Sequence, residues 1–142
     1  MCYYILKEMN MREEQKIDMI IRIALKRLGI KTSLFGFDCM VEAIKFAIKN
    51  RDRYFKLSEL YSAVAQLRPD WSVRRVCANI QNLVESSYFR GIMCNVSMLF
   101  GFSIFDKYVR PTPFEFIKTM AEYYVLGYYK KFDDFHDDEE NQ

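Results

Sequence analysis

Apolar residues that recur at helical spacing constrain the fold of this chain more than any other feature. From residue 17 they fall at i, i+3, i+4, i+7, i+8 and i+11, and the set is Ile17, Ile20, Ile21, Ala24, Leu25 and Leu28. This spacing puts them on one face of an α-helix. Gly29 follows and suits a helix end, because glycine adopts the left-handed capping conformation freely. The pattern predicts a helix over about 11–28.

Further apolar stripes predict the rest of the secondary structure. Their positions indicate helices at about 37–50, 58–67 and 72–87 and a short helical turn at 96–100. The motif Thr112-Pro113-Phe114-Glu115 predicts the start of a last helix. Thr112 suits the N-cap, Pro113 suits the first helical position, and Glu115 can complete a capping box with Thr112. Alternating strand patterns are nearly absent. We therefore expect an all-α fold of about six helices without clear β-strands.

The length and composition are those of one globular domain. The chain has 142 residues, of which 51% are hydrophobic and 28% charged, and this length is enough for a buried core. We expect an N-terminal extension (1–16), a helical domain (17–131) and an acidic tail (132–142). The tail has no lysine or arginine and is expected to be disordered.

The formal net charge of +2 hides an uneven distribution of charge. Residues 132–142 contain six of the 19 acidic residues, so the remaining chain has 13 acidic against 21 basic residues and a net charge of +8. A basic body suits a polyanion such as nucleic acid.

Several classes of function find no support in the sequence. The single histidine, His136, lies in the acidic tail, and no glycine-rich phosphate-binding motif is present. The cysteines Cys2, Cys39, Cys77 and Cys94 are widely spaced, which argues against a zinc site and fits reduced thiols. No run approaches the ~18 apolar residues of a membrane span, and no signal peptide is evident. We expect a cytoplasmic protein that is no enzyme, has no catalytic residues, metal or cofactor, and contacts no membrane.

The two helices predicted at 58–67 and 72–87 have the outline of a helix-turn-helix. The connection Arg68-Pro69-Asp70-Trp71 ends the first, because proline cannot donate to a continuing helix, and Ser72 suits the N-cap of the second. In such a motif the second helix enters the major groove of DNA. The residues expected to face inward are Leu60, Tyr61, Val64, Leu67, Val73, Val76, Ile80, Leu83 and Val84.

The opposite face of the second helix carries side chains suited to reading bases. Arginine makes paired hydrogen bonds to guanine, and asparagine or glutamine makes them to adenine. We expect the base-facing set to be Arg74, Arg75, Ala78, Gln81 and Asn82. We expect phosphate contacts from Arg51, Arg53, Lys56, Ser58, Arg68 and Arg90. The pattern alone equally fits an ordinary amphipathic helix, and Pro69 stands where many such turns have glycine.

Five segments in order resemble the DNA-binding effector domain of the stage-zero sporulation response regulator. They are LGIKTSLFGFDCMVEAI (28–44), LYSAVAQLRPDWSVRRV (60–76), Arg90-Gly91, SMLFGF (97–102) and RPTPFEFI (110–117). The resemblance covers about 17–128. It implies a winged-helix-like regulator effector domain of six helices, with an embedded helix-turn-helix whose second helix, the fourth of the domain, reads double-stranded promoter DNA. It also implies a head-to-tail homodimer on adjacent DNA sites, with the last helix involved. We expect RNA polymerase or a related regulator as a further partner.

The sequence departs from this family in two ways. The family's full-length proteins carry a phosphorylated receiver domain, whereas only about 16 residues precede the predicted domain here, so we expect no phospho-activation within this chain. Arg75 matches the family's motif, but Cys77-Ala78 stands where the family has a Glu-Arg pair that contacts bases. Alanine cannot hydrogen-bond a base edge, so altered specificity is expected.

A second functional hypothesis is a protein–protein interaction module that keeps the fold and docks onto a related regulator. Cys77-Ala78 and the acidic tail favour this hypothesis. The net charge of +8 on the body and the retained arginines favour DNA binding.

Overall fold

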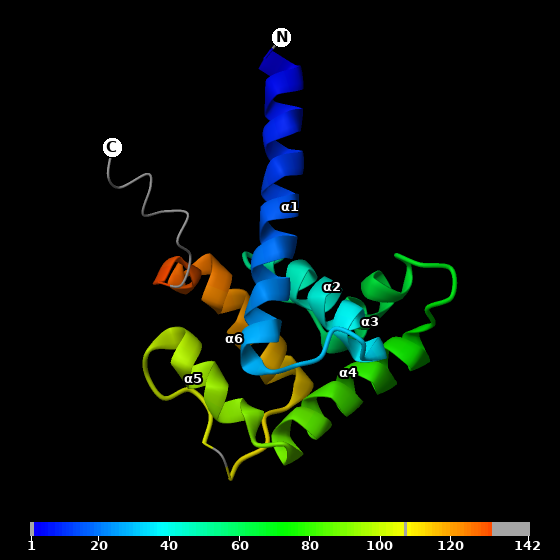
Figure 1. The fold of residues 1–142 in the computed structure, drawn as a ribbon. Coiled ribbons are helices and arrows are strands. Elements are labelled where there is room, and N and C mark those ends of the chain that lie inside the picture. The colour runs from blue at the N-terminus through cyan, green and yellow to red at the C-terminus, as the bar shows by residue number, and fades with distance from the viewer. Residues whose placement is uncertain (1, 107, 132–142) are drawn as a thin grey trace.

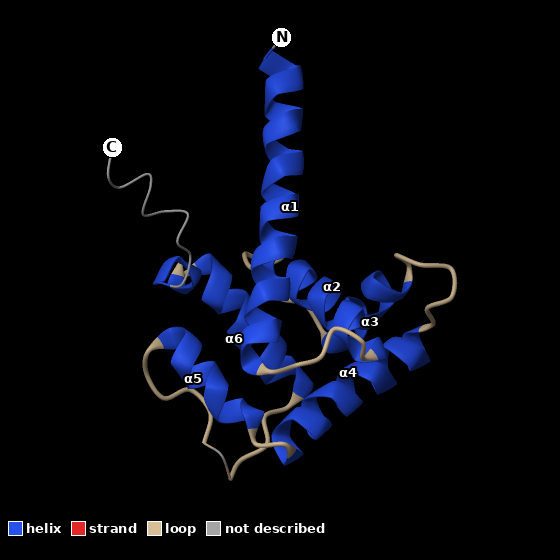
Figure 2. Ribbon diagram, viewed as in Figure 1, coloured by secondary structure: helices blue, strands red, loops and turns tan. Residues whose placement is uncertain are grey.

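A computed structural model describes residues 2–106 and 108–131, and within these residues the chain contains helices and loops but no strand (Figures 1 and 2). The α-helices are α1 (Cys2–Leu28), α2 (Phe35–Lys49), α3 (Leu57–Ala65), α4 (Val73–Phe89), α5 (Asn95–Phe100) and α6 (Pro113–Val125). Short 3-10 helices, η1 (Ile92–Cys94) and η2 (Tyr128–Lys131), flank α5 and α6. The predicted all-α class with six helices is confirmed. The acidic tail lies outside the described residues.

Capping residues set three helix boundaries as predicted, the starts of α6 and α4 and the end of α1. Thr112 accepts from the Glu115 backbone N–H at 3.1 Å, and the Glu115 carboxylate accepts from the Thr112 N–H at 2.9 Å, which completes the capping box. These hydrogen bonds to Thr112 lower the pKa of Glu115. Ser72 caps α4 by accepting from the Arg75 N–H at 3.1 Å. Gly29 has φ = +101°, as the end of α1 requires.

Helix α1 differs from the prediction in its length. We expected it to begin near Met11, but it begins at Cys2, and its N-terminal part projects from the body of the molecule (Figure 1). No proline or glycine interrupts residues 2–28, so nothing in the chain stops the helix at Met11. Among its described side chains, those that join the core lie from Ile17 onward.

Helix α2 forms the centre of the body and packs against α1, α3, α4 and α6. Gly36, in its first turn, allows close approach to α4. A Cβ atom there would lie only 2.6 Å from the Asn79 carbonyl oxygen and 3.1 Å from the Leu83 Cβ. The backbones of α2 and α4 therefore approach so closely at residue 36 that only a glycine fits there.

Two residues predicted to face inward are exposed instead. Leu67 is 57% exposed and Val73 46% exposed. Leu67 follows the end of α3 at Ala65 and lies in the turn, and Val73 is the first residue of α4 at the edge of the body. The other seven inward-facing positions of this unit are buried. None of the described helices has the length and hydropathy needed to cross a bilayer.

Candidate nucleic-acid interface

The turn between α3 and α4 is held by contacts to the neighbouring helices. The Arg68 guanidinium lies 4.6 Å from the centroid of the Trp71 ring and 3.8 Å from an Asp38 carboxylate oxygen on α2. Asp38 also accepts from Arg22 of α1 at 2.9 Å. The helix-turn-helix is therefore tied to α1 and α2 through one carboxylate. Sequence reasoning missed Asp38, since no local pattern relates it to residue 68.

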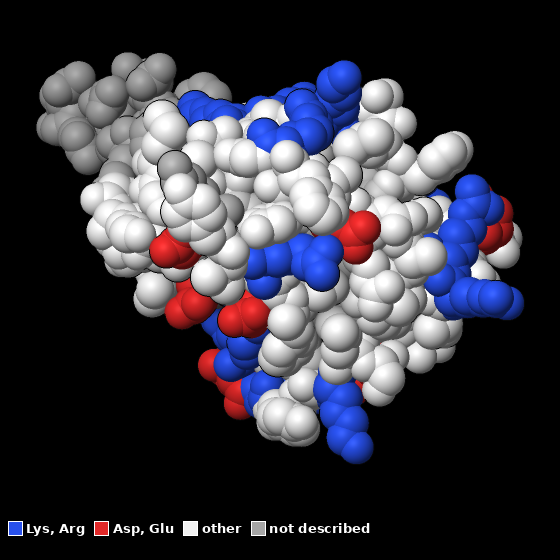
Figure 3. Space-filling view, turned by 90° about the horizontal axis from the view of Figure 1, so that it is seen from below, with Lys and Arg blue, Asp and Glu red and all other residues white. Residues whose placement is uncertain are grey.

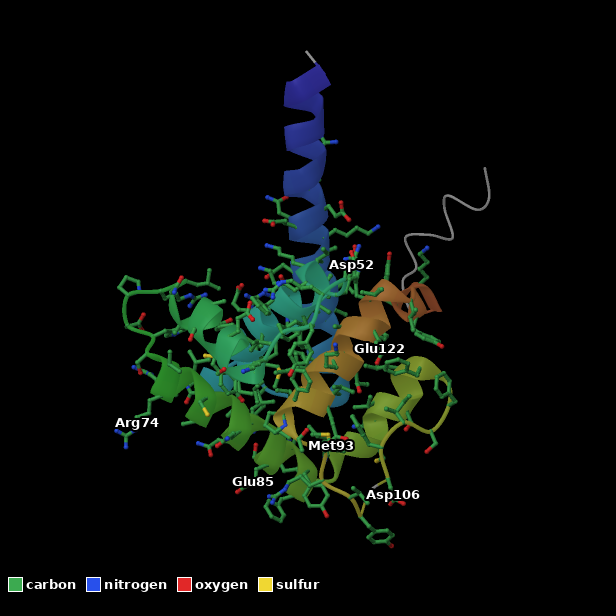
Figure 4. The ribbon with its side chains drawn as sticks, turned by 180° about the vertical axis from the view of Figure 1, so that it is seen from behind. Asp52, Arg74, Glu85, Met93, Asp106 and Glu122 are labelled. Atoms are coloured by element: carbon green, nitrogen blue, oxygen red, sulfur yellow. The ribbon has the colours of Figure 1, made fainter. Side chains whose placement is uncertain are left out.

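Helix α4 exposes the five side chains predicted to face bases. Arg74, Arg75, Ala78, Gln81 and Asn82 are all exposed. Val76, Ile80, Leu83 and Val84 are buried on the opposite side. Figure 4 shows Arg74 pointing away from the body at one end of this helix. Five side chains with hydrogen-bonding or apolar groups thus share one accessible helical surface, as the spacing predicted.

Arg75 is positioned by an aromatic ring from another helix. Its guanidinium lies 5.6 Å from the centroid of Phe35, the first residue of α2, whose side chain is 76% exposed. Arginine over an aromatic face is held by cation–π attraction while its N–H groups stay available. Phe35 gives no periodic signal of this role, since it lies 40 residues earlier in the chain.

Cys77 and Ala78, where the sequence is expected to depart from the family it resembles, lie in different surroundings. Ala78 is exposed, whereas Cys77 is half-buried beside Tyr61 of α3. Burial, together with the neighbouring Cys77, raises the pKa of Tyr61 to about 12. Of the two, only Ala78 lies on the exposed face, so the departure leaves a small apolar group in the middle of that face.

The predicted phosphate-contacting residues are spread over the molecule. Lys56 and Ser58 are exposed at the N-terminal end of α3, Arg68 lies in the turn, and Arg90 follows α4. The remaining two, Arg51 and Arg53, lie in the connection between α2 and α3. Figure 4 shows Asp52 of this connection on the opposite side of the body from Arg74 and Glu85.

Arg51 and Arg53 also have local partners. Arg51 donates to the Ile48 carbonyl oxygen at 2.8 Å, and Arg53 forms an ion pair with Glu59. The hydrogen bond from Arg53 lowers the pKa of Glu59. Both guanidinium groups are therefore engaged by partners in α2 and α3.

The lower surface of the molecule, to which α4 contributes, carries charges of both signs. Figure 3 shows basic side chains in separate groups at the upper edge, at the right and in the middle, with acidic side chains mainly toward the left. One acidic residue on α4 itself, Glu85, forms an ion pair with Arg110 at 3.2 Å. This pair joins residues 25 positions apart, and sequence reasoning missed it.

Metal-binding geometry is not found in residues 2–106 and 108–131, where no three His, Cys, Asp or Glu side chains come together.

Comparison with known proteins relates the chain to one family. The family model described as "Sporulation initiation factor Spo0A C terminal" matches residues 21–124. That match includes the helix-turn-helix and the exposed face of α4. No solved structure matches the chain. Because the family model covers most of the 142 residues, this chain belongs to the Spo0A C-terminal family of DNA-binding effector domains of sporulation regulation.

Proposed function

We propose that this chain is a sequence-specific regulator of transcription, with α4 in the major groove of double-stranded DNA. The observation that carries the proposal is the common exposed face of Arg74, Arg75, Ala78, Gln81 and Asn82 on a helix whose other face is buried. In a helix-turn-helix, this surface of the second helix meets the base edges. The protein acts in the cytoplasm by binding alone, without catalysis.

Base reading is divided between the two ends of this face. Arg74 and Arg75 lie in the first turn of α4, the part of a recognition helix that reaches base edges, and guanine is their natural partner. Gln81 and Asn82 lie two turns further and suit adenine. Ala78 between them offers only apolar contact, for example with a thymine methyl group. This combination favours a target sequence different from that of relatives with a Glu-Arg pair.

Phosphate contacts come from residues on either side of α4. We assign them to Lys56 and Ser58 at the start of α3, where backbone N–H groups also point outward, and to Arg68 and Arg90. Arg51 and Arg53 are left out of this set because their guanidinium groups already bind the Ile48 carbonyl oxygen and the Glu59 carboxylate. Such contacts orient the domain but carry no sequence information.

We further propose that two copies assemble head to tail on adjacent DNA sites. The domain that binds DNA is proposed to span residues 17–131. The exposed apolar side chains of Met98 (70%) and Leu126 (62%) suit contacts between proteins. A second copy, RNA polymerase or a related regulator are the partners we propose for such surfaces. Analytical ultracentrifugation with duplexes carrying one or two sites would distinguish single from paired binding.

The central experiment is selection of the full chain against a random duplex pool, followed by affinity measurements at several salt concentrations. We expect an enriched motif and an affinity that falls as salt rises. Binding without enrichment would leave only general phosphate attraction and favour the docking-module hypothesis. Absence of any salt-dependent binding would overturn the proposal.

A further inference from the structure

We infer that Arg110 positions and neutralises Glu85 on the DNA-facing surface of α4, and thereby keeps this surface able to approach phosphate. The inference rests on the proposed function. At about 100° per residue, Glu85 lies within roughly 40° of Arg74, Ala78 and Gln81 around the helix axis. It is therefore part of the face proposed to meet DNA.

An unpaired carboxylate at this place would oppose DNA binding. Glu85 lies about 16 Å along the axis from Arg74, at 1.5 Å per residue, and its side chain is 57% exposed. Phosphates line both edges of the groove that the helix would enter. Like charges placed together across an interface weaken binding, so the charge of Glu85 requires a nearby cation.

Arg110 supplies that cation from a segment distant in sequence. Its Nη1 lies 3.2 Å from Oε2 of Glu85. Its guanidinium is also 6.0 Å from the centroid of the Phe89 ring, in the last turn of α4. The Tyr88 hydroxyl donates to the Tyr108 carbonyl oxygen at 3.2 Å. These three contacts hold the approach to α6 against the C-terminal end of α4, so Arg110 lies beside Glu85 before DNA arrives.

Folding alone does not explain the pair. Both side chains are about half exposed, and ion pairs in such positions contribute little to stability. The charge that the pair presents to a ligand is its main consequence. Because Arg110 acts through Glu85, removal of the carboxylate makes the arginine dispensable.

The test measures binding of the full-length chain to its selected duplex by fluorescence anisotropy at several salt concentrations. Arg110→Ala should weaken binding about tenfold. The double variant E85Q/R110A should return to within about twofold of the original affinity. Arg110→Lys, which keeps the charge, should bind nearly as well as the original chain.

Lys130→Ala is the matched control, because it removes an exposed basic residue from η2, away from α4 (Figure 1). It should leave affinity unchanged, and thermal unfolding should confirm that every variant is folded. If E85Q/R110A binds as weakly as Arg110→Ala, Arg110 contacts DNA itself and the inference is wrong. An unchanged affinity of Arg110→Ala would also overturn it. If the unmodified chain shows no salt-dependent binding, the proposed function has failed instead.

Discussion

The two faces of α4 differ in burial and in polarity, although they belong to the same 17-residue helix. The inner face consists of Val76, Ile80, Leu83 and Val84, which are buried against the core, where α2, α3 and α6 contact the helix. The outer face carries Arg74 and Gln81, which are exposed. Stability and recognition are thus separated by half a turn of helix. Substitutions should change one property without the other.

The largest effect is expected from truncation of the inner face. Ile80 is fully buried, so Ile80→Ala leaves a cavity and should lower the free energy of unfolding by about 2–5 kcal/mol. Ile23→Ala on α1 is the matched control, because Ile23 is 37% exposed. Denaturant titration measures both variants. Equal losses from the two would contradict the assignment of Ile80 to the core.

The contact between α2 and α4 predicts a change of unusual sign. In most helices Gly→Ala is stabilising by roughly 0.5–1 kcal/mol. Gly36→Ala should instead be destabilising by about 1–3 kcal/mol, because its Cβ would lie 2.6 Å from the Asn79 carbonyl oxygen. Thermal and denaturant unfolding would measure the effect. A stabilised variant would show that α4 does not lie this close to α2.

Substitutions on the outer face should affect DNA binding only. Arg74→Ala or Gln81→Ala should cost about 1–3 kcal/mol on the preferred duplex and relax specificity at one position. The free energy of unfolding should stay within about 0.5 kcal/mol, since both side chains are exposed. Affinities for the selected duplex and for single-base variants of it measure this. Equal losses on all duplexes would assign these residues to phosphate contact.

The smallest change in discrimination between DNA sequences is expected from substitution of Lys56. Lys56→Ala should weaken binding to all duplexes alike and lower the magnitude of the salt slope by about one. Arg53→Ala is the comparison variant, because Arg53 is only three residues away but its guanidinium is already paired with Glu59. An equal effect of both variants would show that the connection between α2 and α3 also approaches DNA.

The sequence by itself determined the helical class, the helix boundaries that carry a capping residue and the exposed face of α4. These properties depend on interactions over one to four residues, such as the capping box of Thr112 and Glu115 or the stripe that includes Ile80. In an α-helix, residues three or four positions apart lie on the same face, so the spacing of apolar residues predicts which face is buried. For this reason the five predicted base-facing residues are all found on one accessible surface.

Only the tertiary structure decided which distant residues support that surface. It brought Phe35 beneath Arg75, Asp38 to Arg68 and Arg110 to Glu85, and it gave Arg51 and Arg53 partners of their own. It also exposed Leu67 and Val73, whose periodicity predicted burial. Such outcomes depend on how whole helices pack and where their ends lie. The spacing of residues along the chain does not reveal these contacts, because the packing of the entire core decides which distant residues meet.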